Sequence, residues 1–202
     1  IVPSIRTTCC VVMVRFVVFV RSVVHEWGLH MCGMWTFLIH VLTYWGMVYV
    51  SRRGKGFWEG VRASLRNQVC CTLPASLLCR GFTDGDVLGS LCAVPLLIVV
   101  SDMYFFVTHY TMHKTWLWRY HKAHHTGGVQ AVQSLDADMV EHVVCNLGSF
   151  IAPFALLRLC GLPFNVWVFR VWVGVSTWST CVSHLGYEAF GDRGVHHLHH
   201  KH

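Results

Sequence analysis

The chain has 202 residues, of which 54% are hydrophobic and only 13% are Asp, Glu, Lys or Arg, and its mean hydropathy is +0.47. A soluble globular domain usually carries about a quarter charged residues. The composition therefore excludes an ordinary soluble domain and predicts an all-α integral membrane protein, a helical bundle with about four transmembrane helices. The net charge of +6 is assigned to basic loops that face an anionic membrane surface, and no nucleic-acid partner is expected.

The first half of the chain alternates between apolar runs and one basic segment. Residues 9–24 are apolar but contain Arg15 and Arg21, so a weak span and an interfacial helix both remain possible. Residues 27–50 are a better candidate for a membrane span. The segment 51–67 is rich in Arg and Lys and is predicted to be a loop on the cytosolic side.

Four further apolar runs follow. Residues 67–81 are short for a span, so they would cross only with help from flanking residues or as half of a hairpin. Residues 87–107 are long enough to return to the cytosolic side, and the more polar residues 126–142 are expected to continue along that surface. Residues 143–160 and 162–183 are joined at a Gly-Leu-Pro turn and predict a helical hairpin whose two ends lie on the same side.

Histidines gather in HYTMHKTWLWRYHKAHH, residues 109–125, and in the terminal HHLHH. The first two are one helical turn apart, and the next three follow an i, i+3, i+4 spacing that the terminal triplet repeats. Such spacing places the rings on one helix face, and twofold repetition is hard to obtain from packing alone. With one isolated histidine after the hairpin, the candidate metal ligands are His109, His113, His121, His124, His125, His184, His196, His199 and His200.

Nine imidazoles exceed the needs of one metal ion, since a structural zinc takes four ligands and a catalytic zinc three. Neutral imidazole nitrogens suit first-row transition metals, so the pattern predicts two metals with open positions, in a cap on the cytosolic side. Whether His142 supports a ligand or is an ordinary surface residue stays open. Nearby acids are expected to fix the ring tautomers, without an assignment of acid to ring. They are Asp102, Asp138, Glu141, Glu188 and Asp192.

The order of these histidine boxes resembles the fatty acid hydroxylase/sterol desaturase superfamily of membrane di-iron oxygenases over about residues 60–202. HYTMHKTWLWRYHKAHH is similar to the first two boxes and VHHLHH to the third. DMVEH and SHLGYE resemble two further elements, with Met139 in place of Pro and Leu185 in place of Ser, and LRNQ at 65–68 is also similar. The closest resemblance is to sterol desaturases and sterol methyl oxidases.

The resemblance implies a catalytic domain over residues 67–202, preceded by N-terminal helices and the basic loop over residues 1–66. It implies two non-haem irons held by the nine histidines, O2, and electrons from NAD(P)H through a cytochrome b5-like protein. Cleaving an unactivated C–H bond requires an oxidant that no side chain supplies, so a cofactor must provide it. The implied reaction is hydroxylation or desaturation of a sterol or fatty-acyl lipid, in lipid biosynthesis. The implied location is the endoplasmic reticulum membrane of a eukaryote.

A histidine-rich membrane metal transporter or metal-binding protein is the alternative. It predicts ligands near the middle of spanning helices, with a polar path through the bilayer. An oxygenase of this kind instead predicts ligands at one membrane face, close to helix ends.

Overall fold

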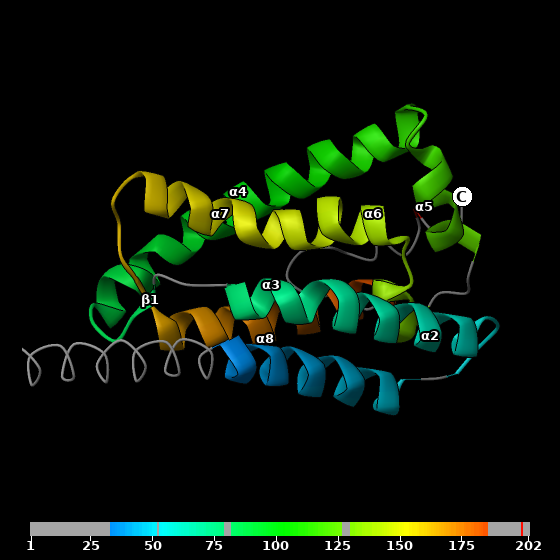
Figure 1. The fold of residues 1–202 in the computed structure, drawn as a ribbon, viewed down its shortest axis with the longest axis horizontal. Coiled ribbons are helices and arrows are strands. Elements are labelled where there is room, and N and C mark those ends of the chain that lie inside the picture. Colours follow the sequence, from blue (N-terminus) through cyan, green and yellow to red (C-terminus); the bar gives the residue numbers. More distant parts are fainter. Residues whose placement is uncertain (1–32, 52, 79–81, 127–129, 186–198, 200–202) are drawn as a thin grey trace, which may run out of the picture.

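The computed structural model describes residues 33–51, 53–78, 82–126, 130–185 and 199, and this part of the chain is mostly helical, as the composition predicts (Figure 1). The predicted segment 9–24, the candidate ligands His196 and His200, and the acids Glu188 and Asp192 lie outside the described residues. After a helix over residues 33–50, the elements are α2 (Phe57–Asn67), η1 (Gln68–Thr72), α3 (Leu73–Leu78), β1 (Phe82–Thr83), α4 (Val87–Lys114), α5 (Trp118–Thr126), η2 (Ala131–Leu135), α6 (Met139–Glu141), η3 (His142–Leu147), α7 (Gly148–Leu159), β2 (Phe164–Asn165) and α8 (Val166–Ser183).

Two of the described helices are apolar and long enough to cross a membrane, judged by length and composition. They are Val87–Lys114 and the continuous run Met139–Leu159, which joins α6, η3 and α7. Only 6% of the most apolar stretch of the first is buried inside the protein, so apolar side chains cover its outer surface. An apolar helix exposed in this way is suited to lipid rather than to water. The remaining crossings of the expected four stay a prediction.

The basic segment 51–67 is a loop only in its first part, because α2 begins at Phe57. Gly56 adopts a left-handed conformation with φ 77°, which turns the chain sharply into the helix. Residues on one face of α2 are then buried, among them Phe57, Gly60 and Ser64. The prediction of a loop was wrong beyond residue 56, because the later positive charges of this segment lie on a helix whose other face is buried.

The hairpin predicted over residues 143–183 is present. Helix α7 ends in a Schellman motif, in which Leu162 N donates to Leu157 O (2.9 Å) and Gly161 N to Arg158 O (3.1 Å). Gly161 has φ 68°, the left-handed value that this motif requires. The chain then forms the short parallel pair β1–β2, and Asn165 caps α8 by accepting from Trp167 N at 2.8 Å. The turn sends α8 back toward the end of the bundle where α6 begins (Figure 1).

Residues 130–135, which were expected to continue along the membrane surface, are buried inside the protein. All five residues of η2 are buried, and η2 packs between α2 and α8. The Tyr44 hydroxyl lies 2.6 Å from Ser64 Oγ and donates to the Val132 carbonyl at 2.8 Å, so η2 is bonded to two helices. A buried backbone carbonyl needs such a donor, which is why a polar pair sits in this apolar core.

Replacing Tyr44 by Phe tests this attachment. Tyr44 is fully buried, so loss of its hydroxyl removes two buried hydrogen bonds while the ring packing remains. We expect the free energy of unfolding to fall by about 1–2 kcal/mol, measured by denaturant titration in detergent. Tyr110→Phe is the matched control at a side chain that is 54% exposed, and it should change stability by less than about 0.5 kcal/mol. Equal effects of the two substitutions would contradict the assignment.

Candidate metal centre

The candidate centre is built where α4 ends and α5 turns back. His109 and His113 lie in the last two turns of α4, which ends at Lys114. Thr115 is extended, and its carbonyl accepts from Trp118 N at 3.1 Å, so the chain reverses within a few residues and enters α5. The turn places the end of α4 and α5 together at one end of the bundle (Figure 1). The histidines of the two helices converge there.

Five imidazoles meet at this point, and their candidate ligand atoms all lie within 4.8 Å of one another. The ring atoms that face one another across the cluster are Nε2 nitrogens. The residues are His109, His113, His121, His125 and His199. The Nε2–Nε2 distances are 3.3 Å for 109–113, 3.0 Å for 109–199, 2.9 Å for 113–199, 2.9 Å for 113–121 and 2.9 Å for 121–125.

This donor set fits a transition metal. A metal–nitrogen bond of about 2.1 Å places neighbouring ligand atoms roughly 3.0–3.4 Å apart in the common coordination geometries, which matches the separations above. Neutral imidazole is a ligand that iron, zinc and copper share. The C-terminus of α4 also carries the negative end of the helix dipole, which favours a cation there. Five ligands are more than a structural zinc takes.

His124 and His184 form a second pair beside the five-histidine cluster. His124 Nδ1 lies 3.0 Å from the Asp136 carbonyl, and His184 Nδ1 lies 2.9 Å from the Thr180 carbonyl. A carbonyl oxygen only accepts, so each Nδ1 carries the ring proton and each Nε2 presents a lone pair. The two Nε2 atoms are 3.4 Å apart and both rings are buried. Two facing lone pairs at this distance are suited to sharing a cation.

One of the five predicted acids contacts a ring of the cluster among the described residues. Glu141 Oε1 lies 2.8 Å from His121 Nδ1, and both side chains are buried, although the ring N–H is not aimed directly at the oxygen. Asp138 instead caps α6 by accepting from Val140 N at 2.8 Å. Asp102 is exposed on α4. Of the described acids expected near the rings, Glu141 is the one whose carboxylate lies beside a ring of the cluster, while backbone carbonyls contact the Nδ1 atoms of His124 and His184.

The structure places seven of the nine candidate ligands, five in the cluster and two in the pair, and the other two lie outside the described residues. His142 is not a surface residue. It is 1% exposed, and its Nε2 lies 3.0 Å from Thr72 Oγ1. Its neighbour Glu141 faces the cluster, so these two consecutive residues connect η1 to the histidines.

Supporting residues that the sequence pattern did not single out lie at the end of α2. Asn67 Nδ2 donates to the carbonyls of Leu135 (3.1 Å) and Ala137 (2.9 Å), and Arg66 donates to Ala137 O at 2.7 Å. These bonds fix the backbone segment in which the Asp136 carbonyl accepts a hydrogen bond from His124 Nδ1. The LRNQ sequence marked these positions, but nothing in it indicated which backbone groups they bind.

Burial lowers the pKa of the imidazoles outside the apolar spans. The pKa of His121 falls to about 4 because its ring is removed from water. Burial and then the neighbouring histidines lower the pKa of His125 to about 3. The same causes, with burial first, lower the pKa of His199. Rings that stay neutral well below pH 7 keep their lone pairs available to a metal.

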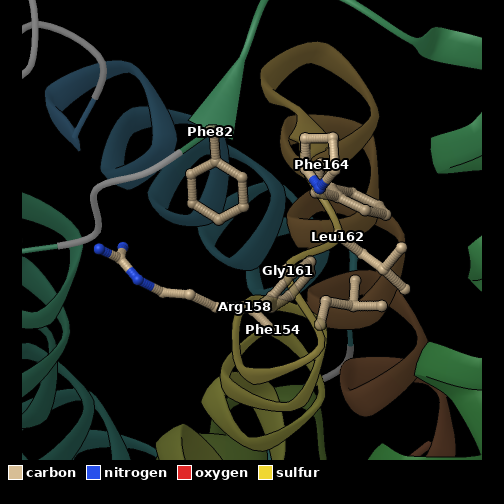
Figure 2. A pocket seen from close by; sticks show the side chains of 8 residues that line it. Phe82, Phe154, Arg158, Gly161, Leu162 and Phe164 are labelled. Carbon is tan, nitrogen blue, oxygen red and sulfur yellow. The ribbon is translucent and has the colours of Figure 1, made fainter.

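A pocket of about 320 Å³ lies at the other end of the bundle. Phe82, Phe154 and Phe164 line it around the turn after α7, with Arg158 beside them (Figure 2). The chain rises from Glu141 to Arg158 along one helical run, which corresponds to roughly 25 Å at 1.5 Å per residue. The pocket is therefore separate from the histidine cluster and does not provide a substrate position there.

A family model described as "Fatty acid hydroxylase" matches residues 94–202. This match includes both histidine boxes of α4 and α5 and the terminal one. No curated protein and no solved structure gives a significant match to the chain.

The lowered pKa values predict how the stability of the metal-free protein depends on pH. Unfolded histidines titrate near pH 6.5, so between about pH 6.5 and pH 4 the unfolded chain binds protons that the folded chain does not. Burial raises the pKa of Glu141 to about 7, which opposes this trend, but the histidines with lowered pKa values outnumber it, so stability should fall as the pH drops from about 6.5 to 4. Chemical unfolding with a chelator present measures this, and His121→Gln should show a shallower slope. A flat profile in the wild type would contradict the prediction.

Proposed function

The chain belongs to the fatty acid hydroxylase family, and on this basis we propose that it is a membrane di-iron oxygenase that hydroxylates or desaturates a lipid. Membership makes it a lipid-modifying oxygenase, an oxidoreductase associated with metal and membrane. The observation that carries the proposal is the convergence of five Nε2 atoms from α4, α5 and His199 within 4.8 Å.

The described histidines would hold the two irons in two groups. The five-histidine cluster would hold one, and the pair His124–His184 would contribute to the other. His196 and His200, which share the spacing of the terminal triplet, are proposed to complete the set. Iron held there supplies the redox chemistry with O2 that no side chain provides. The overall hydroxylation is RH + O2 + 2e⁻ + 2H⁺ → ROH + H2O, and desaturation uses the same inputs to give an alkene and two waters.

The side chains of this chain hold the centre and limit access to it. His121 and His124 are buried, so water does not compete for their Nε2 atoms. The Trp118 ring lies 5.3 Å from the His113 ring and 5.6 Å from the His125 ring, covering one side of the cluster. The outward surface of α4 carries exposed apolar groups such as Phe106. A lipid is proposed to approach along that helix, where placement of its C–H bond decides between alcohol and alkene.

The finer features of the proposal follow from the sequence resemblance. The sterol desaturase and sterol methyl oxidase-like elements DMVEH and SHLGYE support a sterol or related lipid as substrate. Four crossings, a location in the endoplasmic reticulum membrane and a centre facing the cytosol belong to the same proposal. So does electron delivery from NAD(P)H by a cytochrome b5-like protein. Lys114, Arg119 and Lys122 near the cluster favour a cytosolic position.

The position of the cluster favours an oxygenase over a metal transporter. His109 and His113 lie near the end of a helix that began at Val87, not at its middle. A transport path would place ligands near mid-membrane, where spanning helices are interrupted. The cluster also draws on α5, which is too short to span a bilayer.

Metal content of the purified full chain tests the proposal. We expect about two irons per chain. We expect His113→Gln to lose metal and to lose at least about 100-fold in product formation, because mutating residues that only hydrogen-bond to metal ligands already costs about 10- to 100-fold. His40→Gln is the matched control, since His40 bonds to Thr177 and Gln68 outside the cluster. It should retain its iron.

Product analysis supplies the second test. Protein in lipid vesicles with a reduced electron donor and ¹⁸O2 should yield a labelled alcohol or an unsaturated lipid, identified by mass spectrometry. Zinc as the bound metal, together with metal flux across the vesicle membrane, would contradict the oxygenase and favour the transporter.

A further inference from the structure

Glu141 stands at a helix position where a glutamate side chain usually bonds to the backbone of its own helix. Asp138 caps α6, so Glu141 is the third residue of the helix, where a glutamate often folds back onto the backbone N–H of the cap. Here its side chain contacts His121 instead, with Oε1 2.8 Å from Nδ1. Glu141 is 2% exposed and the His121 side chain 0%. A buried carboxylate directed at one ring is costly unless that contact compensates for its desolvation.

The contact determines which nitrogen of His121 is available. An ionised carboxylate and an unprotonated Nδ1 would repel each other at 2.8 Å, so one of the two groups carries a proton. If that proton is on Nδ1, the Nε2 lone pair faces His113 and His125, each 2.9 Å away. The alternative tautomer would direct an N–H into the cluster and block a metal bond. An ionised Glu141 therefore favours the tautomer that the cluster needs.

The neighbouring residue holds the helix in the rotation that aims Glu141. His142 Nε2 lies 3.0 Å from Thr72 Oγ1, and its Nδ1 lies 3.3 Å from Asn146 Nδ2. Consecutive residues point about 100° apart around a helix, so with His142 bonded to η1, Glu141 is directed away from η1 toward α5. Both partners of this bond are in or beside π-helical turns, a feature often found near functional sites.

We infer that Glu141 is a positioning residue that holds the proton of His121 on Nδ1, so that Nε2 is presented to the metal in the five-histidine cluster. This inference rests on the proposed function only in requiring that the cluster bind a metal. Glu141 acts through His121 and does not itself hold the metal. The carboxylate also strengthens His121 as a donor, because a negative partner makes an imidazole more basic.

The experiment titrates the metal-free full chain in detergent with Co²⁺, whose visible absorption reports ligand geometry. Glu141→Leu removes the acceptor, Glu141→Gln keeps a neutral acceptor of the same shape, and Glu59→Gln is the matched control at an exposed glutamate on α2. We expect Co²⁺ affinity to fall up to about 100-fold for Glu141→Leu and about 10-fold for Glu141→Gln. Glu59→Gln should bind as the wild type does. The absorption band should shift in the Leu variant and be largely kept in the Gln variant.

The ranking of variants separates positioning from a general loss of stability. Helical content and unfolding temperature are measured in parallel, and variants of equal stability that differ in Co²⁺ affinity support the inference. Glu141→Asp is the second variant, which keeps the charge but withdraws it by one methylene, and we expect it to bind about as weakly as Glu141→Leu. Wild-type affinity and an unchanged spectrum in Glu141→Leu or Glu141→Asp would overturn the role of Glu141. If the wild type bound no Co²⁺ or iron, the proposed function would fail as well.

Discussion

Imidazole nitrogens that face one another without a proton between them repel, and this constraint governs the rest of the molecule. The pair His124–His184 shows it most clearly, because both Nδ1 atoms lie on carbonyl oxygens and both Nε2 lone pairs therefore point inward at 3.4 Å. The cluster of five repeats the problem with Nε2 separations near 3 Å. A cation between the rings would relieve this repulsion, so the arrangement is suited to a metal ligand.

Holding seven rings in place requires polar groups inside an otherwise apolar bundle. The buried segment η2 provides them, since it exposes backbone carbonyls to Tyr44 and Asn67 on one side and leaves the Asp136 carbonyl to His124 on the other. The carbonyls of Val132, Leu135 and Asp136 each have a partner, as a low-dielectric interior demands. Asn67 at the end of α2 therefore fixes the backbone of residues 135–137, and the Asp136 carbonyl in that segment orients His124 of α5.

The histidine positions were predictable because helical spacing alone aligns rings on one face, and His109, His121 and His125 indeed meet. The hairpin was predictable from its Gly-Leu-Pro turn, since Gly161 adopts the left-handed conformation that ends α7. The buried course of η2 was not, because its five residues are too few to show a periodicity and are held by tertiary hydrogen bonds that no sequence pattern shows. The acid that contacts His121 could not be predicted for the same reason. Several acids were candidates, and the rotation of the helix that carries Glu141 decides which one reaches the ring.

The character of the donor set bears on the chemistry that it can support. Soluble di-iron proteins surround their metals with glutamates, which neutralise much of the positive charge. Here the described candidate ligands are all neutral rings, and among the described acids only Glu141 contacts one of them. Neutral ligands leave the metal charge largely uncompensated, so they favour the less positive oxidation state. Iron held by these rings would therefore accept electrons more readily than in a carboxylate site, and the carboxylate of Glu141, acting through His121, would moderate that preference.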